Sequence, residues 1–305
     1  MKILVIGGTG FIGRVLVRYL VENGNEVTVS SSGKRRTSIL GVKEYLIFDR
    51  FNPQSLVNSV SRLGHFDIVY DQLAFRIKDV KDLVKLLEGK TESYVFASSA
   101  AVYEGKSGIL SEEDFDPYTY EYDERESEKT YAEGKRNVEA YVYQNAEFPV
   151  SSARFPSIFG NCDSTLRFQD HLKRIEEGKP FWAPGNSGRR NYAWVDDAGR
   201  FLAWLGTKKK LGPFNGASEE YFDIRSFLEL IGHSMGKDVS FQSESKLDKS
   251  RYYKEEDFIL STYKANKEGF RFTGTEEWLK TEVANYRLNP CPERSSQDYA
   301  DSLFP

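Results

Sequence analysis

The sequence predicts an α/β fold built on a doubly wound parallel sheet, with a smaller lobe towards the C-terminal end. Strand-like apolar runs alternate with helix-like segments, a pattern that favours parallel strands connected by helices. In addition, residues 1–30 have the pattern of a strand, a glycine-rich turn, a helix and a second strand, which is a βαβ unit. The chain of 305 residues is long enough for one large domain or two closely joined ones.

The individual elements follow from hydrophobic periodicity. Lys2–Ile6 is an apolar run too short for a helix and is typical of a strand buried on both faces. A helix is expected over 14–23, with Gly24 as its C-terminal stop, and the next strand over 26–29. Further strands are expected at 45–48, 66–70, 93–97 and 150–153, and further helices at 80–87, 131–142 and 224–232.

Glycines occupy the turn between the first strand and the first helix. Gly7 permits a tight turn, Gly10 lets the backbone approach a pyrophosphate, and Gly13 allows the helix to pack closely on the strand. The pyrophosphate would lie at the helix N-terminus, on free backbone N–H groups. In this context the motif, with Phe11 and Ile12 inside it, predicts dinucleotide binding; an unoccupied glycine-rich turn is the alternative.

The end of the second strand bears on the choice of dinucleotide. An acidic residue there would bind the ribose 2′-OH of NAD, but this sequence has none. Hydroxyls and cations stand where a 2′-phosphate would lie, namely Ser30, Ser31, Ser32, Lys34 and Arg35. This favours NADP(H) and leaves NAD(H) as a second possibility, with an ordinary polar loop as the structural alternative. Asp49, at the end of the third strand, is expected near the adenine amino group.

Composition excludes several classes of protein. The net charge of −4 and the pI near 5.7 disfavour nucleic acid as a bulk partner. Apolar runs are too short to span a membrane, and the N-terminus resembles neither a signal nor a transit peptide. The only cysteines, Cys162 and Cys291, suit a reducing compartment, so we expect a cytoplasmic protein. Histidine and cysteine spacing predicts no metal site.

A tyrosine and a lysine stand four positions apart in the helix expected after the fifth strand. Tyr131 and Lys135 therefore project from one helix face. A phenol with a pKa of about 10 is a poor base at neutral pH. An adjacent ammonium and a cationic nicotinamide ring would lower that pKa. A serine hydroxyl at the end of the fifth strand could hold a substrate oxygen beside the phenol. Alone, the pair indicates no more than a surface contact; with the glycine motif and the serine it predicts a catalytic site.

With these motifs the sequence resembles the extended short-chain dehydrogenase/reductases, the family of NAD(P)-dependent sugar epimerases and dehydratases. The resemblance covers residues 1 to about 279. It rests on GGTGFIG (7–13), SSAAVY (98–103), YAEGK (131–135), ARFPSIFG (153–160) and RRNYAWVDDAG (189–199). It implies a Rossmann fold and a catalytic trio of Ser99, Tyr131 and Lys135, Ser99 being four positions before Tyr103.

The resemblance also implies binding residues. Gln72, Leu73, Ala74 and Phe155 are implied at the cofactor, together with Tyr131 and Lys135. Arg190, followed by the acid Asp197, is implied to grip a substrate diphosphate, and Arg251, 13 positions before Lys264, to be a second phosphate arginine by analogy with the galactose epimerases. A structural ion pair is the alternative for each arginine. Ser99 and Ser157 complete the substrate contacts.

Some positions depart from the family pattern. Ala100 and Ala101 stand where the sugar 4,6-dehydratases carry an acid pair, so dehydration is not expected. Ser157 replaces the asparagine that epimerases usually present to the sugar nucleotide, and Asp71-Gln72-Leu73-Ala74 replaces the usual His-Leu-Ala beside the nicotinamide. These two changes leave the substrate open.

The sequence thus predicts an NAD(P)-dependent epimerase or reductase acting on a hydroxyl or ketone of a nucleotide-sugar-like substrate. The segment 98–160 also resembles the chloroplast stem-loop-binding proteins, a branch of the same fold in which some members are linked to RNA. A non-catalytic NAD(P)-binding protein that binds RNA or serves as a scaffold is therefore the alternative, although the acidic pI and the intact trio count against it.

The domain plan completes the expectations. Residues 1–160, with 189–205 returning to them, are assigned to the NAD(P)-binding domain, 161–188 and 206–288 to the substrate-binding lobe, and 289–305 to a polar tail. The acidic segment 111–130 is expected to be a solvated loop, with Ser127 or Thr130 capping the next helix. Helices around 78–88 and 130–146 resemble the four-helix dimer interface of the family, so a homodimer is expected.

Overall fold

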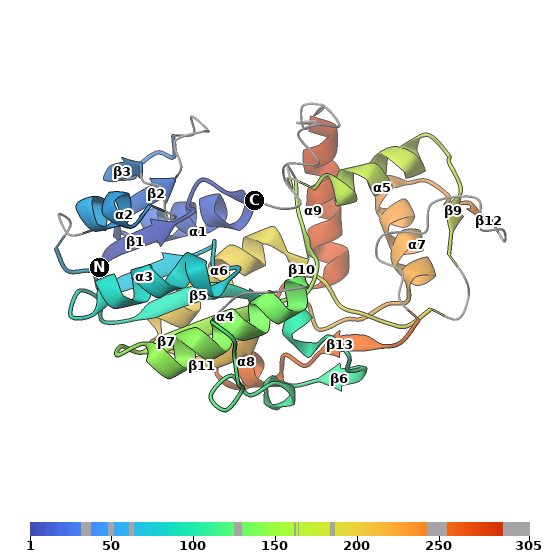
Figure 1. Ribbon diagram of the computed structural model, residues 1–305. Helices are drawn as coiled ribbons and strands as arrows, with labels where there is room; N and C mark the ends of the chain where they lie inside the picture. Colours follow the sequence, from blue (N-terminus) through green and yellow to red (C-terminus); the bar gives the residue numbers. More distant parts are fainter. Residues whose placement is uncertain are drawn as a thin grey trace.

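A computed structural model describes residues 1–31, 38–47, 52–60, 64–124, 130–161, 163, 165–183, 187–242 and 255–288. In this part of the chain a seven-stranded parallel sheet has the strand order β11-β7-β5-β4-β1-β2-β3 (Figure 1). The strands are β1 (Lys2–Ile6), β2 (Glu26–Ser31), β3 (Glu44–Ile47), β4 (Ile68–Asp71), β5 (Tyr94–Ser99), β7 (Val150–Phe155) and β11 (Gly212–Asn215). The predicted doubly wound α/β fold is confirmed.

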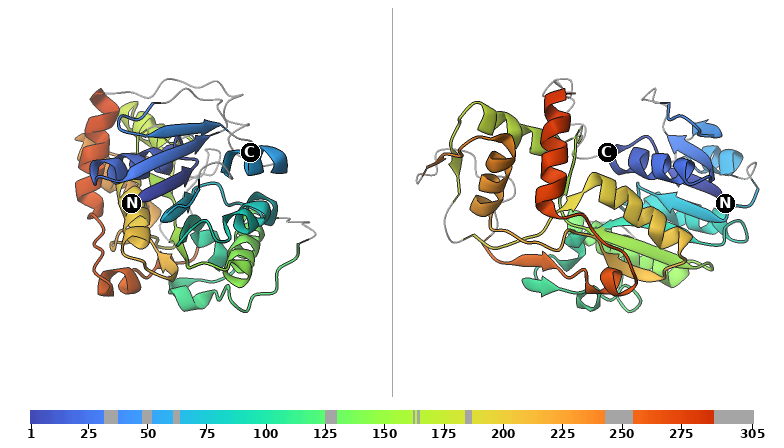
Figure 2. Two further views of the ribbon diagram at one scale, coloured as in Figure 1. Left: turned by 90° about the vertical axis from the view of Figure 1, so that its left-hand side faces the viewer. Right: turned by 180° about the vertical axis from the view of Figure 1, so that it is seen from behind.

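Helices cover both faces of the sheet and bury its apolar residues in two layers (Figure 2). On one face lie α1 (Phe11–Glu22) and α6 (Val195–Thr207), which share a core with β1, β2 and β7. On the other lie α2 (Pro53–Val60), α3 (Ile77–Leu87) and α4 (Tyr131–Asn145). In sheets of this kind ligands bind at the carboxyl ends of the strands.

The lobe has a core of its own, rich in aromatic rings. Trp278, fully buried, stacks on Phe159 with ring centroids 5.9 Å apart. Around this core lie α5 (Arg167–Glu176), β9 (Phe181–Trp182), α7 (Ile224–Met235), β12 (Phe241–Gln242) and α9 (Thr275–Leu288). Two further strand pairs and a short helix are β8 (Ile158–Phe159) with β10 (Ala193–Trp194), β6 (Gly108–Leu110) with β13 (Phe258–Leu260), and α8 (Tyr263–Lys267). Two short 3₁₀ helices, η1 (Ala100–Tyr103) and η2 (Glu112–Asp114), complete the described elements.

The structure corrects the plan in one respect. Residues 206–288 are predicted to belong to the lobe, yet β11 within that range pairs in parallel with β7 and forms the end of the large sheet. Its sequence, Gly-Pro-Phe-Asn, contains one large apolar residue, so it offers no hydrophobic run to recognise. Strands β5 and β7 also continue further than expected, to Ser99 and Phe155, because they pair with each other there and bury the polar residues Ser98 and Arg154. The expected tail, 289–305, lies outside the described residues.

Glu282 fastens the lobe helix α9 to the strand pair β8–β10. Its side chain is 2% exposed, and Oε1 accepts a hydrogen bond of 2.7 Å from the indole Nε1 of Trp194. Burial raises the pKa of this carboxyl above its ordinary value. The lobe is therefore anchored through a carboxyl group whose ionised form burial disfavours.

The variant Glu282→Gln should become more stable than the wild type as the pH rises. Because the folded-state pKa of Glu282 lies above the ordinary 4.5, the wild type loses stability as the pH rises through that folded-state value. Glutamine retains an acceptor for Trp194 without ionising, so we expect its stability relative to the wild type to increase as the pH rises through that folded-state value. Urea unfolding across this range checks the difference, with the exposed Glu277→Gln as control. A difference that does not change with pH would contradict the prediction.

Candidate active site at the carboxyl ends of the strands

The turn after β1 has the geometry that requires glycine. Gly7 has φ +75°, and its N–H donates to the Ser30 carbonyl at 3.0 Å. A Cβ added to Gly13 would lie 2.3 Å from the Gly7 carbonyl oxygen, so α1 approaches the turn as closely as the motif predicts. Gly10 is the N-cap of α1 and provides no side chain to cap it.

The N-terminus of α1 suits a bound anion. Its first turn, which begins with Phe11, Ile12 and Gly13, contains no acidic residue. The unoccupied N–H groups and the positive end of the helix dipole therefore face the turn without a competing side chain. These features fit the pyrophosphate of a dinucleotide, while the dinucleotide contacts themselves stay a prediction.

The residues predicted to distinguish NADP from NAD are only partly described. Ser30 is buried and Ser31 half-buried at the end of β2. Ser32, Lys34, Arg35, Asp49 and the proposed phosphate residue Arg251 lie outside the described residues. The preference for NADP(H) therefore stays a prediction.

The connection from β4 to α3 lies against the glycine turn. A Cβ on Gly7 would lie 2.8 Å from Leu73 Cγ. Asp71, fully buried, accepts from the Leu73 N–H at 2.7 Å and from the Tyr94 hydroxyl at 2.9 Å, and so fixes this connection. Both polar atoms of the Gln72 amide are buried without a hydrogen-bond partner among the described residues. Because an unpaired buried amide is costly, Gln72 is a group that a ligand at this turn could satisfy.

Lys135 lies below Tyr131 and is almost completely buried. Its side chain is 2% exposed, and Nζ donates to the carbonyls of Ala74 at 2.8 Å and Ala97 at 3.1 Å. Nζ lies 5.8 Å from the ring centroid of Tyr131 and 4.5 Å from that of Phe75. No carboxylate of the described residues forms an ion pair with this ammonium, so its charge is free to act on a neighbouring phenolate.

Tyr131 opens α4 with its ring 57% exposed. Thr130, one of the two predicted caps, accepts from the Glu133 N–H at 3.1 Å and so begins the helix at this residue. The phenol therefore projects outward from a capped helix end, above the buried ammonium.

Ser99 ends β5 and caps the 3₁₀ helix η1 (Ala100–Tyr103). Its Oγ accepts from the Ala101 N–H at 3.2 Å, which leaves the hydroxyl proton available to another acceptor. It stands two residues after Ala97, which binds Lys135. The structure thus brings Ser99, Tyr131 and Lys135 to one end of the sheet, although within the described residues no hydrogen bond joins Ser99 to Tyr131.

Phe155, the last residue of β7, is buried, and its predicted contact with the cofactor stays a prediction. Its side chain is 3% exposed and packs in the core beside Phe201, with ring centroids 6.1 Å apart. A Cβ on Gly216 would lie 2.7 Å from this ring. The ring therefore packs against Phe201 and Gly216 at the carboxyl end of β7.

Arg190 has no anionic partner among the described residues. Within the same residues its Nε is buried with no hydrogen-bond partner, and burial lowers the pKa of the guanidinium. Its Cζ lies 5.6 Å from the Phe258 ring centroid. The preceding Arg189, in contrast, pairs with Asp257 at 2.6 Å. Within the described residues the structural ion pair is thus made by Arg189, and Arg190 is suited to an external anion.

The other predicted substrate-side residues have structural contacts. Ser157 is half-buried, and its carbonyl accepts from the Ala193 N–H at 3.1 Å. Asp197 is 1% exposed and accepts from the Thr273 N–H at 2.6 Å and from Arg200 at 2.8 Å. Asp197 therefore fastens α6 to the segment before α9.

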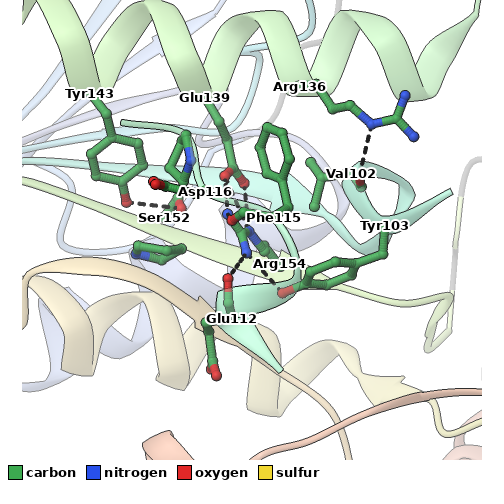
Figure 3. Close-up of polar contacts among 12 residues, drawn as sticks. Val102, Tyr103, Glu112, Phe115, Asp116, Arg136, Glu139, Tyr143, Ser152 and Arg154 are labelled. Carbon is green, nitrogen blue, oxygen red and sulfur yellow. Dashed lines mark hydrogen bonds and ion pairs between the residues drawn. The ribbon is translucent and has the colours of Figure 1, made fainter. Parts of the chain in front are cut away.

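The sequence analysis missed a buried charge network beside the trio (Figure 3). Arg154 on β7 and Glu139 on α4 are both 0% exposed, and Arg154 NH2 lies 2.6 Å from Glu139 Oε2. Arg154 also donates to the Tyr103 hydroxyl at 2.8 Å, and that hydroxyl donates to Asn215 Oδ1 at 2.8 Å. The carbonyls of Glu112 and Phe115 accept the remaining N–H groups at 2.9 Å. Tyr103 and Arg154 both lie in motifs that carry the resemblance, but nothing in the sequence pairs either with Glu139.

The described residues lack both a cluster of metal ligands and a membrane-spanning helix. No group of three or more histidines, cysteines or acidic residues could hold a metal ion there. None of the helices in the same residues is long and apolar enough to cross a bilayer.

Comparison with known proteins identifies a matching family and two similar proteins. The model of the NAD dependent epimerase/dehydratase family matches residues 3–216. The chloroplast stem-loop binding protein of 41 kDa b from Arabidopsis thaliana is 31% identical over 242 residues, which cover 73% of this chain and 58% of the relative. A UDP-glucose 4-epimerase from Lactobacillus helveticus is 31% identical over 121 residues, 34% of this chain and 37% of the relative. The chain thus matches about half the length of these curated relatives.

Solved structures share the fold. A UDP-glucose 4-epimerase from Thermus thermophilus, solved with NAD, has a TM-score of 0.72 at 23% identity, covering 94% of this chain and 99% of its own. A UDP-glucose 4-epimerase from Thermotoga maritima, solved with UDP-glucose, has a TM-score of 0.75 at 20% identity with the same coverage.

Proposed function

The chain belongs to the NAD-dependent epimerase/dehydratase family, and from this premise we propose that it is an NAD(P)-dependent epimerase or reductase. Its substrate is a hydroxyl or ketone of a nucleotide-sugar-like molecule. The observation that carries the proposal is the buried Lys135, held by the carbonyls of Ala74 and Ala97 without a carboxylate from the described residues, beneath the exposed phenol of Tyr131. Such an ammonium stabilises a phenolate that can serve as a base.

Three side chains perform the proton chemistry in this proposal. The Tyr131 phenolate takes the proton from the substrate hydroxyl, and the Ser99 hydroxyl donates a hydrogen bond to the same oxygen. The Lys135 ammonium, 5.8 Å from the ring centroid of Tyr131, supplies a positive charge beside that phenolate. A bound nicotinamide supplies the acceptor and donor of the hydride. Epimerase and reductase use the same three residues, and net consumption of NADPH distinguishes the reductase.

The cofactor and substrate classes rest on separate features. Relatives are solved with NAD, while the hydroxyls and cations at 30–36 support NADP(H) for this chain. Arg190, with no anionic partner in the described residues, supports a substrate diphosphate. Ala100 and Ala101 in η1 leave no acid next to Ser99, which argues against 4,6-dehydration. The homodimer through α3 and α4 and the cytoplasmic location are further parts of the proposal.

A thermal unfolding titration tests the ligands. NADP⁺ or NAD⁺, and separately UDP-glucose, should stabilise the protein by about 2.7 kcal/mol at a hundredfold excess over Kd, since a ligand of the folded state raises its stability. The variant Arg190→Met should keep the dinucleotide effect and lose the UDP-glucose effect. If neither dinucleotide stabilises the wild type, the proposed function is wrong.

A non-catalytic RNA-binding protein is the second candidate, favoured by the similarity to the chloroplast stem-loop binding protein. The three consecutive lysines at 208–210 do not form a free basic patch, which argues against this candidate: Lys209 lies 3.8 Å from Glu92, and Lys210 pairs with Glu268 at 2.5 Å. RNA binding predicts retardation of a labelled stem-loop RNA that falls steeply with salt. We expect no retardation even at low salt.

A further inference from the structure

The trio is divided between two elements that are not consecutive in the chain. Ser99 caps η1, whereas Tyr131 and Lys135 stand on α4. Hydrogen bonding to one substrate oxygen from both elements requires a fixed separation between them. The contacts that hold η1 on α4 therefore determine whether Ser99 and Tyr131 can bind the same substrate oxygen.

Arg136 connects the two elements directly. It follows Lys135 on α4, and its Nε donates to the Val102 carbonyl at 2.8 Å (Figure 3). Its NH2 donates to the Glu104 carbonyl at 2.7 Å. Both acceptors lie at the C-terminal end of η1, where helix carbonyls have no partner within the helix. The planar guanidinium, which donates through two nitrogens, matches this pair of oxygens.

A second connection links η1 to α4 through Arg154 of β7. The Tyr103 hydroxyl accepts from Arg154, and Arg154 pairs with Glu139 of α4. Arg136 thus holds the backbone of η1 and Arg154 holds its last side chain, both against α4. Arg136 is half-buried and bears no part of the buried charge network, so it can be changed without leaving a buried charge unpaired.

We propose that Arg136 is a positioning residue, which sets the place of Ser99 relative to Tyr131 by fastening the C-terminal end of η1 to α4. This inference rests on the proposed function and adds to it a residue outside the trio. Arg136 contacts neither substrate nor cofactor in this role; it acts through the backbone of residues 99–104.

The test compares Arg136→Gln with a matched control. Arg174 of α5 makes the same kind of contact, since its Nε and NH2 both donate to the Pro180 carbonyl, but it lies in the lobe. With a turned-over nucleotide sugar, Arg136→Gln should lower kcat roughly 10- to 100-fold with little change in KM, as expected for a small misplacement of a reacting group. Arg136→Lys should restore part of kcat, and Arg174→Gln should leave it unchanged.

Amide hydrogen exchange gives a readout that does not depend on activity. Arg136→Gln should speed exchange in residues 99–104, and Arg174→Gln should leave exchange there unchanged. Wild-type kcat in an Arg136→Gln protein that still binds the dinucleotide overturns the inference. If the wild type turns over no nucleotide sugar, the proposed function is contradicted, and hydrogen exchange alone tests the inference. Unchanged exchange at 99–104 in Arg136→Gln would then show that Arg136 does not hold η1 on α4. Faster exchange confined to these residues would support that connection.

Discussion

Replacing Glu139 by alanine should destabilise the protein by about 3–5 kcal/mol. Its partner Arg154 is 0% exposed, so the variant leaves a buried guanidinium without its anion. In the wild type burial opposes the charge of Arg154, but Glu139 and Tyr103 together outweigh burial and raise the pKa of the guanidinium. An arginine side chain stays protonated in proteins even without an anionic partner, so in the variant Arg154 cannot escape the penalty by losing its proton. Urea unfolding monitored by circular dichroism measures the loss.

An exposed ion pair of equal length is the control. Lys81 on α3 lies 2.6 Å from Glu124, the same separation as between Arg154 and Glu139. In the exposed pair, however, the side chains of Lys81 and Glu124 are 40% and 45% exposed. Glu124→Ala should change stability little, because water and salt screen exposed pairs. The double variant Glu139→Leu with Arg154→Met should recover much of the loss, since it removes both buried charges. Equal losses from Glu139→Ala and Glu124→Ala would contradict the burial argument.

Replacing Tyr131 by phenylalanine should lower turnover of a nucleotide sugar by about 10²–10⁴-fold, the usual contribution of a general acid–base group. Within the described residues the Tyr131 hydroxyl forms no hydrogen bond, and the ring is 57% exposed. The variant should therefore fold and bind the dinucleotide like the wild type. Steady-state kinetics measure turnover, and calorimetry measures dinucleotide binding.

Another exposed tyrosine serves as the comparison. Tyr263 on α8 is 72% exposed and lies on a different element from the trio, so Tyr263→Phe should retain full turnover. Full turnover in Tyr131→Phe would remove this residue from the mechanism. Loss of dinucleotide binding in the same variant would show that the Tyr131 hydroxyl serves cofactor binding.

Local patterns were sufficient for much of the fold. The run Lys2–Ile6, the glycines after it and the apolar spacing of residues 80–87 each predict their element without reference to distant residues. The predicted start of α1 is late, at 14 rather than Phe11, because its first turn is the glycine motif itself. Elements that have a local pattern of apolar residues or glycines can thus be predicted from the sequence alone.

The remainder depends on distant partners. Arg154 is a charged residue inside a buried strand, and only Glu139, 15 positions earlier on another element, makes that burial tolerable. Arg190 and Arg189 are neighbours of identical chemistry, yet within the described residues one pairs with Asp257 and the other does not. Which arginine stays available to a ligand is decided by residue 257, and sequence spacing contains no such information.

The position of β11 in the chain has a consequence for protein synthesis. A ribosome must complete α5, β9, β10 and α6 before Gly212–Asn215 can pair with β7. Until then the growing chain presents β7 as an open strand edge, a form that invites pairing with other chains. Asn215 of β11 also accepts a hydrogen bond from Tyr103, so the buried charge network is complete only after β11 has been synthesised. A nascent chain ending near residue 160 therefore has an incomplete sheet, which only the strand after the first part of the lobe completes.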